Sequence, residues 1–162
     1  MKTPKRFKIN LREPVSCLTH FYSFLFAIPV TLLLIGGSIR QGDSVKTFSF
    51  LIFGLSLMLL YGASALYHGV NAEPKKIEFL RRIDHMMIFV LIAGTYTPVC
   101  LVNLASSCGR TLFLAIWGFA IFGLLLKIFW LDAPRFLSTA LYVIMGWLAV
   151  FAFIPLRNAV PM

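Results

Sequence analysis

The chain has 162 residues, of which 59% are hydrophobic and 13% are charged, and its mean hydropathy is +0.86. This is more apolar surface than a soluble globule of this size can bury, so a water-soluble domain is excluded and a lipid environment is indicated. Lysine and arginine outnumber aspartate and glutamate by 15 to 6, but these cations stand in short clusters between long apolar runs, which argues against a nucleic-acid partner.

Five charge-poor stretches follow one another along the chain, and each is long enough to cross a bilayer, which takes about 20 apolar residues for a core of about 30 Å. Backbone polar groups must be paired in lipid, and the runs lack the alternation of barrel strands, so they predict helices. The sequence therefore predicts an all-α, polytopic transmembrane helical bundle that forms a single domain over residues 1–162. Its spans are expected at about 17–39, 47–69, 85–105, 111–131 and 136–156.

The first stretch follows a basic N-terminal region, as the apolar part of a signal peptide does. It is too long for a cleaved signal, and no small-residue cleavage pattern follows it, so we interpret it as a retained first span. Pro29 in the first stretch and Pro98 in the third predict kinks, which neighbouring helices can accommodate.

Orientation follows from lysine and arginine, which are enriched on the cytoplasmic side of membrane proteins. The side that holds the N-terminus and the loops after spans two and four carries eleven of these residues: Lys2, Lys5, Arg6, Lys8, Arg12, Lys75, Lys76, Arg81, Arg82, Lys127 and Arg135. The other side carries four: Arg40, Lys46, Arg110 and Arg157. We therefore expect a multi-pass protein of the inner (plasma) membrane with a cytoplasmic N-terminus and an extracytoplasmic C-terminus.

In this orientation the polar residues of three spans fall at one depth near the cytoplasmic leaflet. His20 opens the first span, Ser64 and His68 close the second, and Asp84 and His85 open the third. Ionisable groups are costly inside a membrane and usually face the bundle interior or a wet cavity, which makes these residues candidates for a functional site. Ser64 and His68 are four residues apart and share one helical face. Imidazole is a common zinc ligand, and a carboxylate can bind the ion or orient its water.

Structural interpretations of the same residues stay open beside the functional one. A carboxylate such as Asp84 near a helix start suits the helix dipole, and His20 suits the membrane interface. A serine and a histidine four residues apart also occur together by chance. An alternative zinc site of His20, His68 and His85 has a legitimate number of ligands, but the spacing does not show that the three side chains converge.

Two segments together resemble the paired signature of the hemolysin III/PAQR family: SALYH at 64–68 and RIDHMMIFVLIAGTYTP at 82–98. The segment EPVSCLTH at 13–20 is similar to the stretch that enters the first helix in bacterial members of that family. The three segments stand in the family's order and spacing. The resemblance extends over nearly the whole chain, from about residue 11 to about residue 156.

The resemblance implies a seven-helix membrane fold with a zinc ion near the cytoplasmic side. It implies that His68 is a metal ligand, that Ser64 is the serine near the metal, and that Asp84 is the catalytic carboxylate that holds the zinc-bound water. The family's other two ligands belong to a His-x-x-x-His motif in the last helix. This chain ends at Met162 after five predicted spans and has no histidine after His85, so we expect a C-terminally shortened member with an incomplete site.

Two classes of function follow as hypotheses. In the first, the chain serves membrane homeostasis or cytolysis, as a regulator of bilayer properties or as a pore-former, although polar residues at one leaflet alone do not resemble a channel lining. The alternative is an enzyme, a zinc-dependent lipid amide hydrolase of ceramidase type that uses metal-activated water. The lipid bilayer is the expected partner in both, and a lipid substrate or ligand and a second copy of the chain are further hypotheses.

Overall fold

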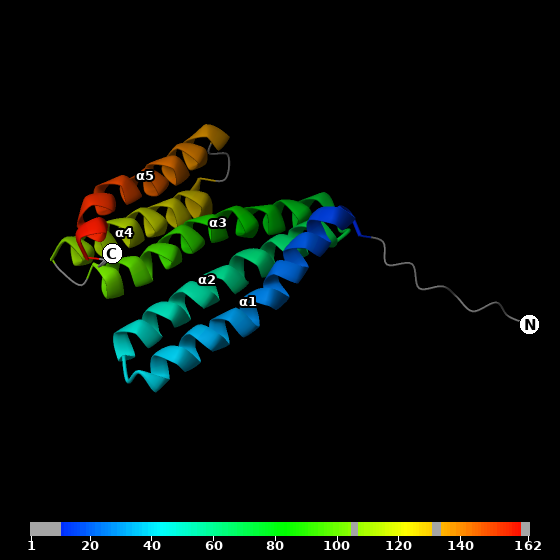
Figure 1. Ribbon diagram of the computed structural model, residues 1–162. Coiled ribbons are helices and arrows are strands. Elements are labelled where there is room, and N and C mark those ends of the chain that lie inside the picture. The colour runs from blue at the N-terminus through cyan, green and yellow to red at the C-terminus, as the bar shows by residue number, and fades with distance from the viewer. Residues whose placement is uncertain (1–10, 105–106, 131–133, 160–162) are drawn as a thin grey trace, which may run out of the picture.

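The computed structural model of the chain contains five α-helices in the residues that it describes (Figure 1). The structure describes residues 11–104, 107–130 and 134–159, with side chains described except at 107, 135 and 151–159. No strand occurs among these described residues, which confirms the all-α prediction. The helices are α1 (Pro14–Arg40), α2 (Ser44–Gly69), α3 (Pro74–Pro98), α4 (Ser107–Phe129) and α5 (Arg135–Ala159), and a π-helical turn, η1 (Val99–Asn103), extends α3.

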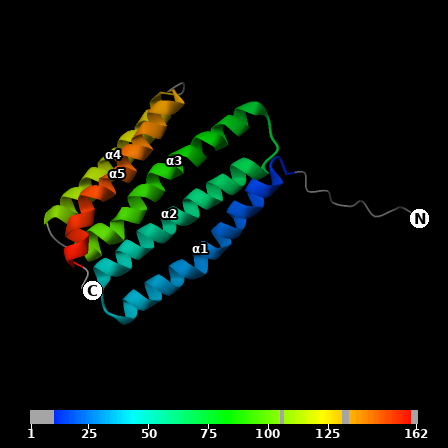
Figure 2. The ribbon, with the colours of Figure 1, turned by 45° about the horizontal axis from the view of Figure 1, so that its top comes forward.

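The helices run up and down in chain order, and each packs against the next. Figure 2 shows α1, α2 and α3 side by side, with α4 and α5 against α3 on the side away from α1. The start of α1 and the α2–α3 connection lie at one end of the bundle, and the α1–α2 turn and the end of α5 lie at the other (Figure 1). Short connections between long antiparallel neighbours are typical of helical bundles.

Local sequence signals explain where the helices begin. Pro14 and Pro74 stand in the first turns of α1 and α3, where a residue without an N–H removes no helical hydrogen bond. Asp43 caps α2, because its carboxylate accepts a hydrogen bond of 2.8 Å from the backbone N–H of Lys46. Gly42 has φ of 67°, a left-handed conformation that glycine adopts without a steric penalty, so it forms the tight turn between α1 and α2.

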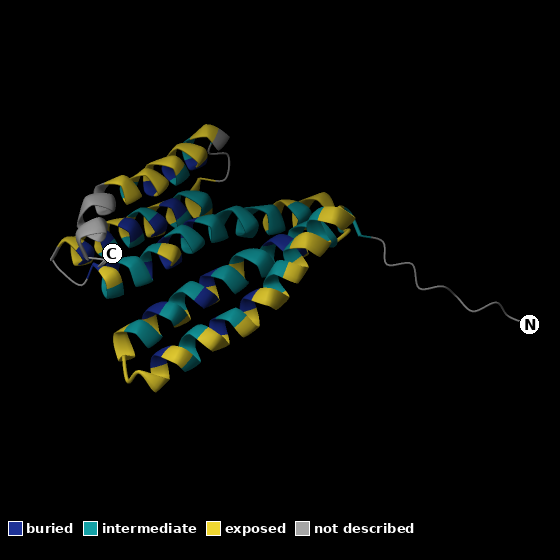
Figure 3. Cartoon of the chain, viewed as in Figure 1, coloured by how far each residue is buried: buried dark blue, intermediate teal, exposed yellow. Residues whose placement is uncertain are grey.

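Four helices in the described part of the chain are long and apolar enough to cross a membrane: α1, α2, α3 extended through η1, and α4. In α5 the described apolar stretch is Phe136–Val150, which is shorter than a full span, so the fifth span stays a prediction. Figure 3 shows exposed positions along the outer faces of the helices and buried positions between the helices. Many of the exposed residues are large and apolar, such as Phe26, Leu33 and Trp147. Such a surface is stable against acyl chains and not against water, and it identifies a multi-pass membrane protein.

The third helix extends beyond the predicted span. The apolar stretch predicted a span from residue 85, and α3 begins at Pro74, with its charged first turns outside the apolar stretch. Asp84 therefore lies almost three turns into α3, so the interpretation of Asp84 as a residue at a helix start is wrong. The π-helical turn follows directly after Pro98, where the missing N–H interrupts the regular ladder, in line with the expected kink.

Small residues let neighbouring helices approach closely. A Cβ on Gly54 would collide with Thr31 of α1, a Cβ on Gly94 would lie 2.6 Å from the Cβ of Ser56 in α2, and one on Gly123 would meet the ring of Phe89. Such contacts hold membrane helices together by van der Waals packing. Between α3, α4 and α5 the core is apolar, and its fully buried members are Phe89, Ala93, Ile116, Ala120 and Met145.

Candidate functional site

Four polar side chains meet where α1 begins and α2 ends, and we call them the polar cluster: Glu13, His20, Ser64 and His68. The backbone brings them together, because the N–H of Glu13 donates to the carbonyl of His68 at 2.9 Å and the N–H of Arg12 donates to that of Gly69 at 3.4 Å. These two bonds satisfy carbonyls that the last turn of a helix leaves without partners. The chain entering α1 is thereby fastened across the end of α2.

One half of the polar cluster is a serine–histidine pair. The Nδ1 atom of His20 lies 2.5 Å from the Oγ of Ser64, which is only 4% exposed. The tautomer of His20 decides which of the two groups donates. The ring of His20 also meets the ring of His68 edge-on, with a centroid distance of 5.5 Å and an interplanar angle of 81°. A buried hydroxyl is therefore held against a ring that can accept its proton, and a second imidazole lies alongside.

The other half is a histidine–carboxylate pair. The Nδ1 atom of His68 lies 2.8 Å from the Oε2 of Glu13, and the two side chains are 19% and 47% exposed. The pKa of Glu13 lies below its usual range, chiefly because its carboxylate accepts this bond; desolvation opposes the shift, and the charges of His68 and Arg12 add to it. The guanidinium of Arg12 lies 3.1 Å from the other oxygen of Glu13 and stacks 4.3 Å from the centroid of the Tyr67 ring.

Asp84 stands at the same level of the bundle as Ser64. Gly94 of α3 lies against Ser56 and the carbonyl of Ile52 in α2. Antiparallel helices have the same rise per residue, so ten residues back along α3 correspond to ten residues forward along α2. Asp84 therefore lies opposite residues 62–66. No hydrogen bond or ion pair joins Asp84 to Ser64 in the described part of the chain, so a site shared by the two residues stays a prediction.

His85 is tied to a different part of the bundle. The hydroxyl of Tyr142 in α5 donates to the carbonyl of His85 at 2.7 Å, and the ring of Phe89, one turn further along α3, packs 4.5 Å from the ring of Tyr142. The backbone at His85 thus contacts α5, whereas His20 and His68 meet between α1 and α2. The structure brings two of the three histidines together.

The polar cluster supplies some, but not all, of the ligands that a zinc site needs. A carboxylate on Nδ1 of His68 is the arrangement typical of a metal-binding histidine, since it leaves Nε2 for the ion. Among the described residues, however, no group of three or more histidine, cysteine, aspartate or glutamate side chains is placed to hold a metal ion. The residues fit one ligand and not a complete set, and zinc stays a prediction.

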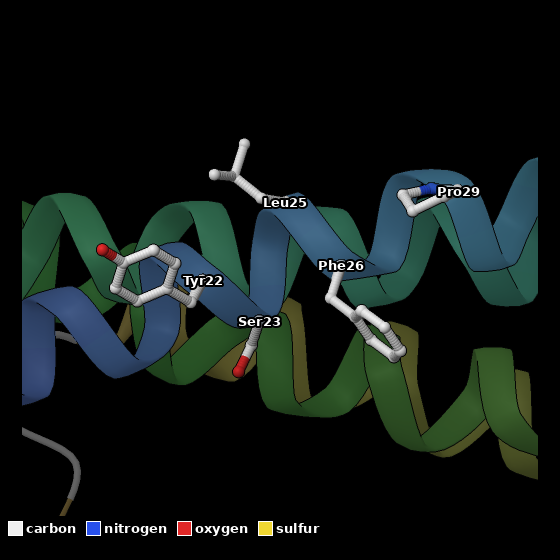
Figure 4. A pocket seen from close by; sticks show the side chains of 5 residues that line it. All are labelled: Tyr22, Ser23, Leu25, Phe26 and Pro29. Carbon is white, nitrogen blue, oxygen red and sulfur yellow. The ribbon is translucent and has the colours of Figure 1, made fainter.

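Among the surface hollows of the described residues, two lie near the N-terminal half of α1. One of about 600 Å³ lies on the outer face of α1, where Figure 4 shows its lining. Tyr22 and Phe26 are widely exposed there, and the hydroxyl of Ser23 donates to the carbonyl of Thr19 in its own helix. This hollow offers mostly apolar surface to lipid, and its polar side-chain groups are the hydroxyls of Tyr22 and Ser23.

The second hollow, of about 470 Å³, is a groove between α1 and α2 next to the polar cluster. Its lining is Leu11, Cys17, Phe21, Phe24, Gly62, Ala65, Leu66, Gly69 and Val70. Every one of these residues is apolar or small, so the groove is suited to an acyl chain and not to a headgroup.

Sequence reasoning named Ser64, His68 and Asp84 as site residues. It considered His20 only as a ligand of the alternative three-histidine site, and it gave Glu13 no role. A signal was present, because residues seven apart in a helix project from nearly the same face, and Glu13 and His20 have this separation. The face they share on α1 meets the face that Ser64 and His68 share on α2.

Comparison with known sequences identifies the family of the chain. The sequence pattern of the family described as "Haemolysin-III related" matches residues 8–162. "Hemolysin-3 homolog" of Bacillus subtilis (strain 168) is 40% identical over 144 residues, which cover 89% of this chain and 67% of that protein. "Hemolysin-3" of Bacillus cereus is 38% identical over 144 residues, which cover 89% of this chain and 65% of that protein. The chain spans about two thirds of the length of these curated relatives, and no solved structure matches it.

Proposed function

Because this chain belongs to the haemolysin-III related family, we propose that it acts within the bilayer in membrane homeostasis. In this proposal, cytolysis is the result of a strong change in the properties of the bilayer. One observation carries the proposal: an apolar, lipid-facing bundle brings two histidines, a serine and a glutamate into contact where α1 begins and α2 ends. A polar site at a single depth of an apolar protein is placed to act on the lipid interface. The positive-inside asymmetry supports a cytoplasmic location of that end, in the inner membrane.

The interior of the bundle does not favour a pore through one chain. Several buried hydroxyls donate to their own backbone, as Thr31 does to Ala27 at 2.6 Å and Thr97 does to Ala93 at 2.9 Å. The core between α3, α4 and α5 is apolar. Cytolysis by this chain would therefore act through disturbance of lipid packing or through assembly of several copies. The second route is the one that requires a homo-oligomer.

Reconstitution tests this proposal. The protein is inserted into phosphatidylethanolamine–phosphatidylglycerol vesicles that contain a quenched dye, and dye release and lipid order are measured against protein dose. We expect the wild type to change both, and the His20→Ala/His68→Ala double variant to lose the effect. Thr19→Ala is the matched control, because the Thr19 hydroxyl is exposed and bonds only within α1. Equal effects of the wild type and the double variant would overturn the proposed role of the polar cluster.

A second function, a zinc-dependent lipid amide hydrolase, is favoured by the carboxylate on Nδ1 of His68 and by the acyl-sized groove beside it. In that function His68 is a metal ligand, Asp84 and Ser64 are the assisting polar groups, and the groove receives one chain of a ceramide-like lipid. Zinc content per purified chain tests it. Stoichiometric zinc in the wild type that is lost in His68→Ala, with hydrolysis of a fluorescent ceramide that is lost in Asp84→Asn, is expected. Absence of zinc from the wild type would contradict it.

A further inference from the structure

Positive charge gathers where α3 and α4 meet, at the end of the bundle that holds the α2–α3 connection (Figure 1). A Cβ on Gly123 would meet the ring of Phe89, so these two residues lie opposite each other on antiparallel helices. Lys127 follows Gly123 by one turn of α4. Arg82 precedes Phe89 by two turns on nearly the same face of α3, so it lies along the α3–α4 contact. The charges of Arg81 and Arg82 act on that of Lys127, and we call these three residues the cationic cluster.

The protein around the cationic cluster does not balance its charge. Arg81 and Arg82 share one carboxylate, that of Glu78, at 3.8 and 3.5 Å. These distances exceed the length of about 2.7–2.9 Å that is typical of a charge-assisted hydrogen bond. Within the described part of the chain Lys127 forms no ion pair. Asp84 follows Arg82 by two residues, which turns it by about 200° to another side of α3, so three positive charges share the one carboxylate.

A phosphate group fits this charge pattern. A guanidinium group binds phosphate through two parallel N–H···O bonds, and a lysine ammonium group adds a point charge. The side chains of Arg81 and Arg82 are 42% and 31% exposed, so an anion can reach them. The negative pole of α4 suits Lys127 in its last turn, but this accounts for only one of the three cations.

Large apolar side chains near the cationic cluster favour a phospholipid over a free phosphate ion. Phe79 is 61% exposed on α3, and Phe129 and Trp130 are 80% and 54% exposed at the end of α4. Lys127 lies two residues before the end of a helix that is long and apolar enough to cross a membrane, which puts the cluster at the interface. A free ion would contact the charges alone, whereas the acyl chains of a lipid also cover the apolar surface. We propose that the cationic cluster binds the phosphate of an anionic phospholipid between α3 and α4.

Native mass spectrometry of the full chain in detergent tests the proposal. Phosphatidylglycerol, phosphatidylcholine and inorganic phosphate are titrated separately, and the bound adducts are counted. We expect the wild type to retain one phosphatidylglycerol molecule more tightly than phosphatidylcholine, and inorganic phosphate at the same concentration not to displace it. Equal retention of the two lipids would overturn the proposal. Inorganic phosphate that binds as tightly as phosphatidylglycerol would overturn the assignment to a lipid.

Charge variants locate the site. A cation near an anionic lipid surface contributes a factor of about five in affinity, so Arg82→Gln/Lys127→Gln should weaken phosphatidylglycerol binding about 25-fold. The matched control is Lys75→Gln/Lys76→Gln, which removes two exposed cations from the first turn of the same helix, outside the cationic cluster. The control should keep most of the affinity. An equal loss in both double variants would indicate general attraction to a basic surface and would overturn the site.

Removal of the shared carboxylate should have the opposite effect. Glu78→Gln leaves an amide of similar shape at a side chain that is 51% exposed, so the fold should tolerate it. Phosphatidylglycerol should then bind severalfold more tightly, because no carboxylate competes for Arg81 and Arg82. Unchanged or weaker binding by Glu78→Gln would overturn the proposal, and this variant decides if Arg82→Gln/Lys127→Gln does not fold. None of these variants alters a residue of the polar cluster, so the result is independent of the proposed function.

Discussion

Replacement of Gly94 by alanine tests the close contact that sets the register of α3 on α2. The added Cβ would lie 2.6 Å from the Cβ of Ser56, which is itself fully buried, so one helix must move. Overpacking of this kind costs about 1–3 kcal/mol, while alanine is favoured over glycine in a helix by about 1 kcal/mol. At Gly118 of α4 a new Cβ meets nothing within 4 Å. Gly118→Ala should therefore change stability only through the higher helix propensity of alanine.

The difference between the two variants isolates the collision, and we expect Gly94→Ala to be less stable than Gly118→Ala by about 1–3 kcal/mol. Reversible unfolding with sodium dodecyl sulfate in mixed micelles, followed by circular dichroism, measures it. Because Ser56→Gly removes the colliding atoms, the double variant should recover at least about 1 kcal/mol as coupling energy. Equal stability of the two alanine variants would refute the close contact, and with it the placement of Asp84 opposite Ser64.

Three further predictions follow from the site and the fold. Ser64→Ala should leave His20 without its 2.5 Å partner and lower the unfolding free energy by about 0.6–1.7 kcal/mol, the range for such bonds in membrane proteins, as measured by the same unfolding assay. Exposed Cys108, at the start of α4, should react with a membrane-impermeant thiol reagent only from the extracytoplasmic side. A cysteine introduced by Glu73→Cys should react only from the cytoplasmic side. The reverse pattern would show that the proposed orientation of the helices is wrong. The pKa of Glu13 is lowered in the folded state, so its stabilising contribution should be present above the ordinary carboxyl pKa and be lost on acidification, which a comparison with Glu13→Gln across pH would detect.

The helices could be predicted because lipid leaves the backbone few alternatives, and charge-free length alone locates the membrane-embedded part of each one. The same criterion does not locate the first residue of α3, because charged residues from Lys75 to Arg82 continue the helix outside the apolar stretch. Hydropathy indicates which part of a helix lies in the membrane, and the helix itself can begin earlier. Asp84 was misplaced relative to its helix for this reason, and its depth in the membrane stays a prediction.

The site was predictable one helix at a time. The four-residue spacing of Ser64 and His68 fixed a shared face on α2, but nothing in the sequence states which face of α1 meets it. That choice depends on the packing of small residues such as Gly54 against Thr31, and on the backbone bond between Glu13 and His68. Pairings between helices are properties of tertiary packing, which a pattern along one chain does not encode.

All four members of the polar cluster lie within the first 69 residues, on two helices joined by a tight turn. During synthesis this hairpin leaves the ribosome before α3 exists, and its contacts need no later segment. His20 and Ser64 can therefore form their hydrogen bond as soon as the second helix enters the bilayer, while the rest of the chain is still being made. The order of insertion, and not only the final packing, protects the polar cluster from lipid.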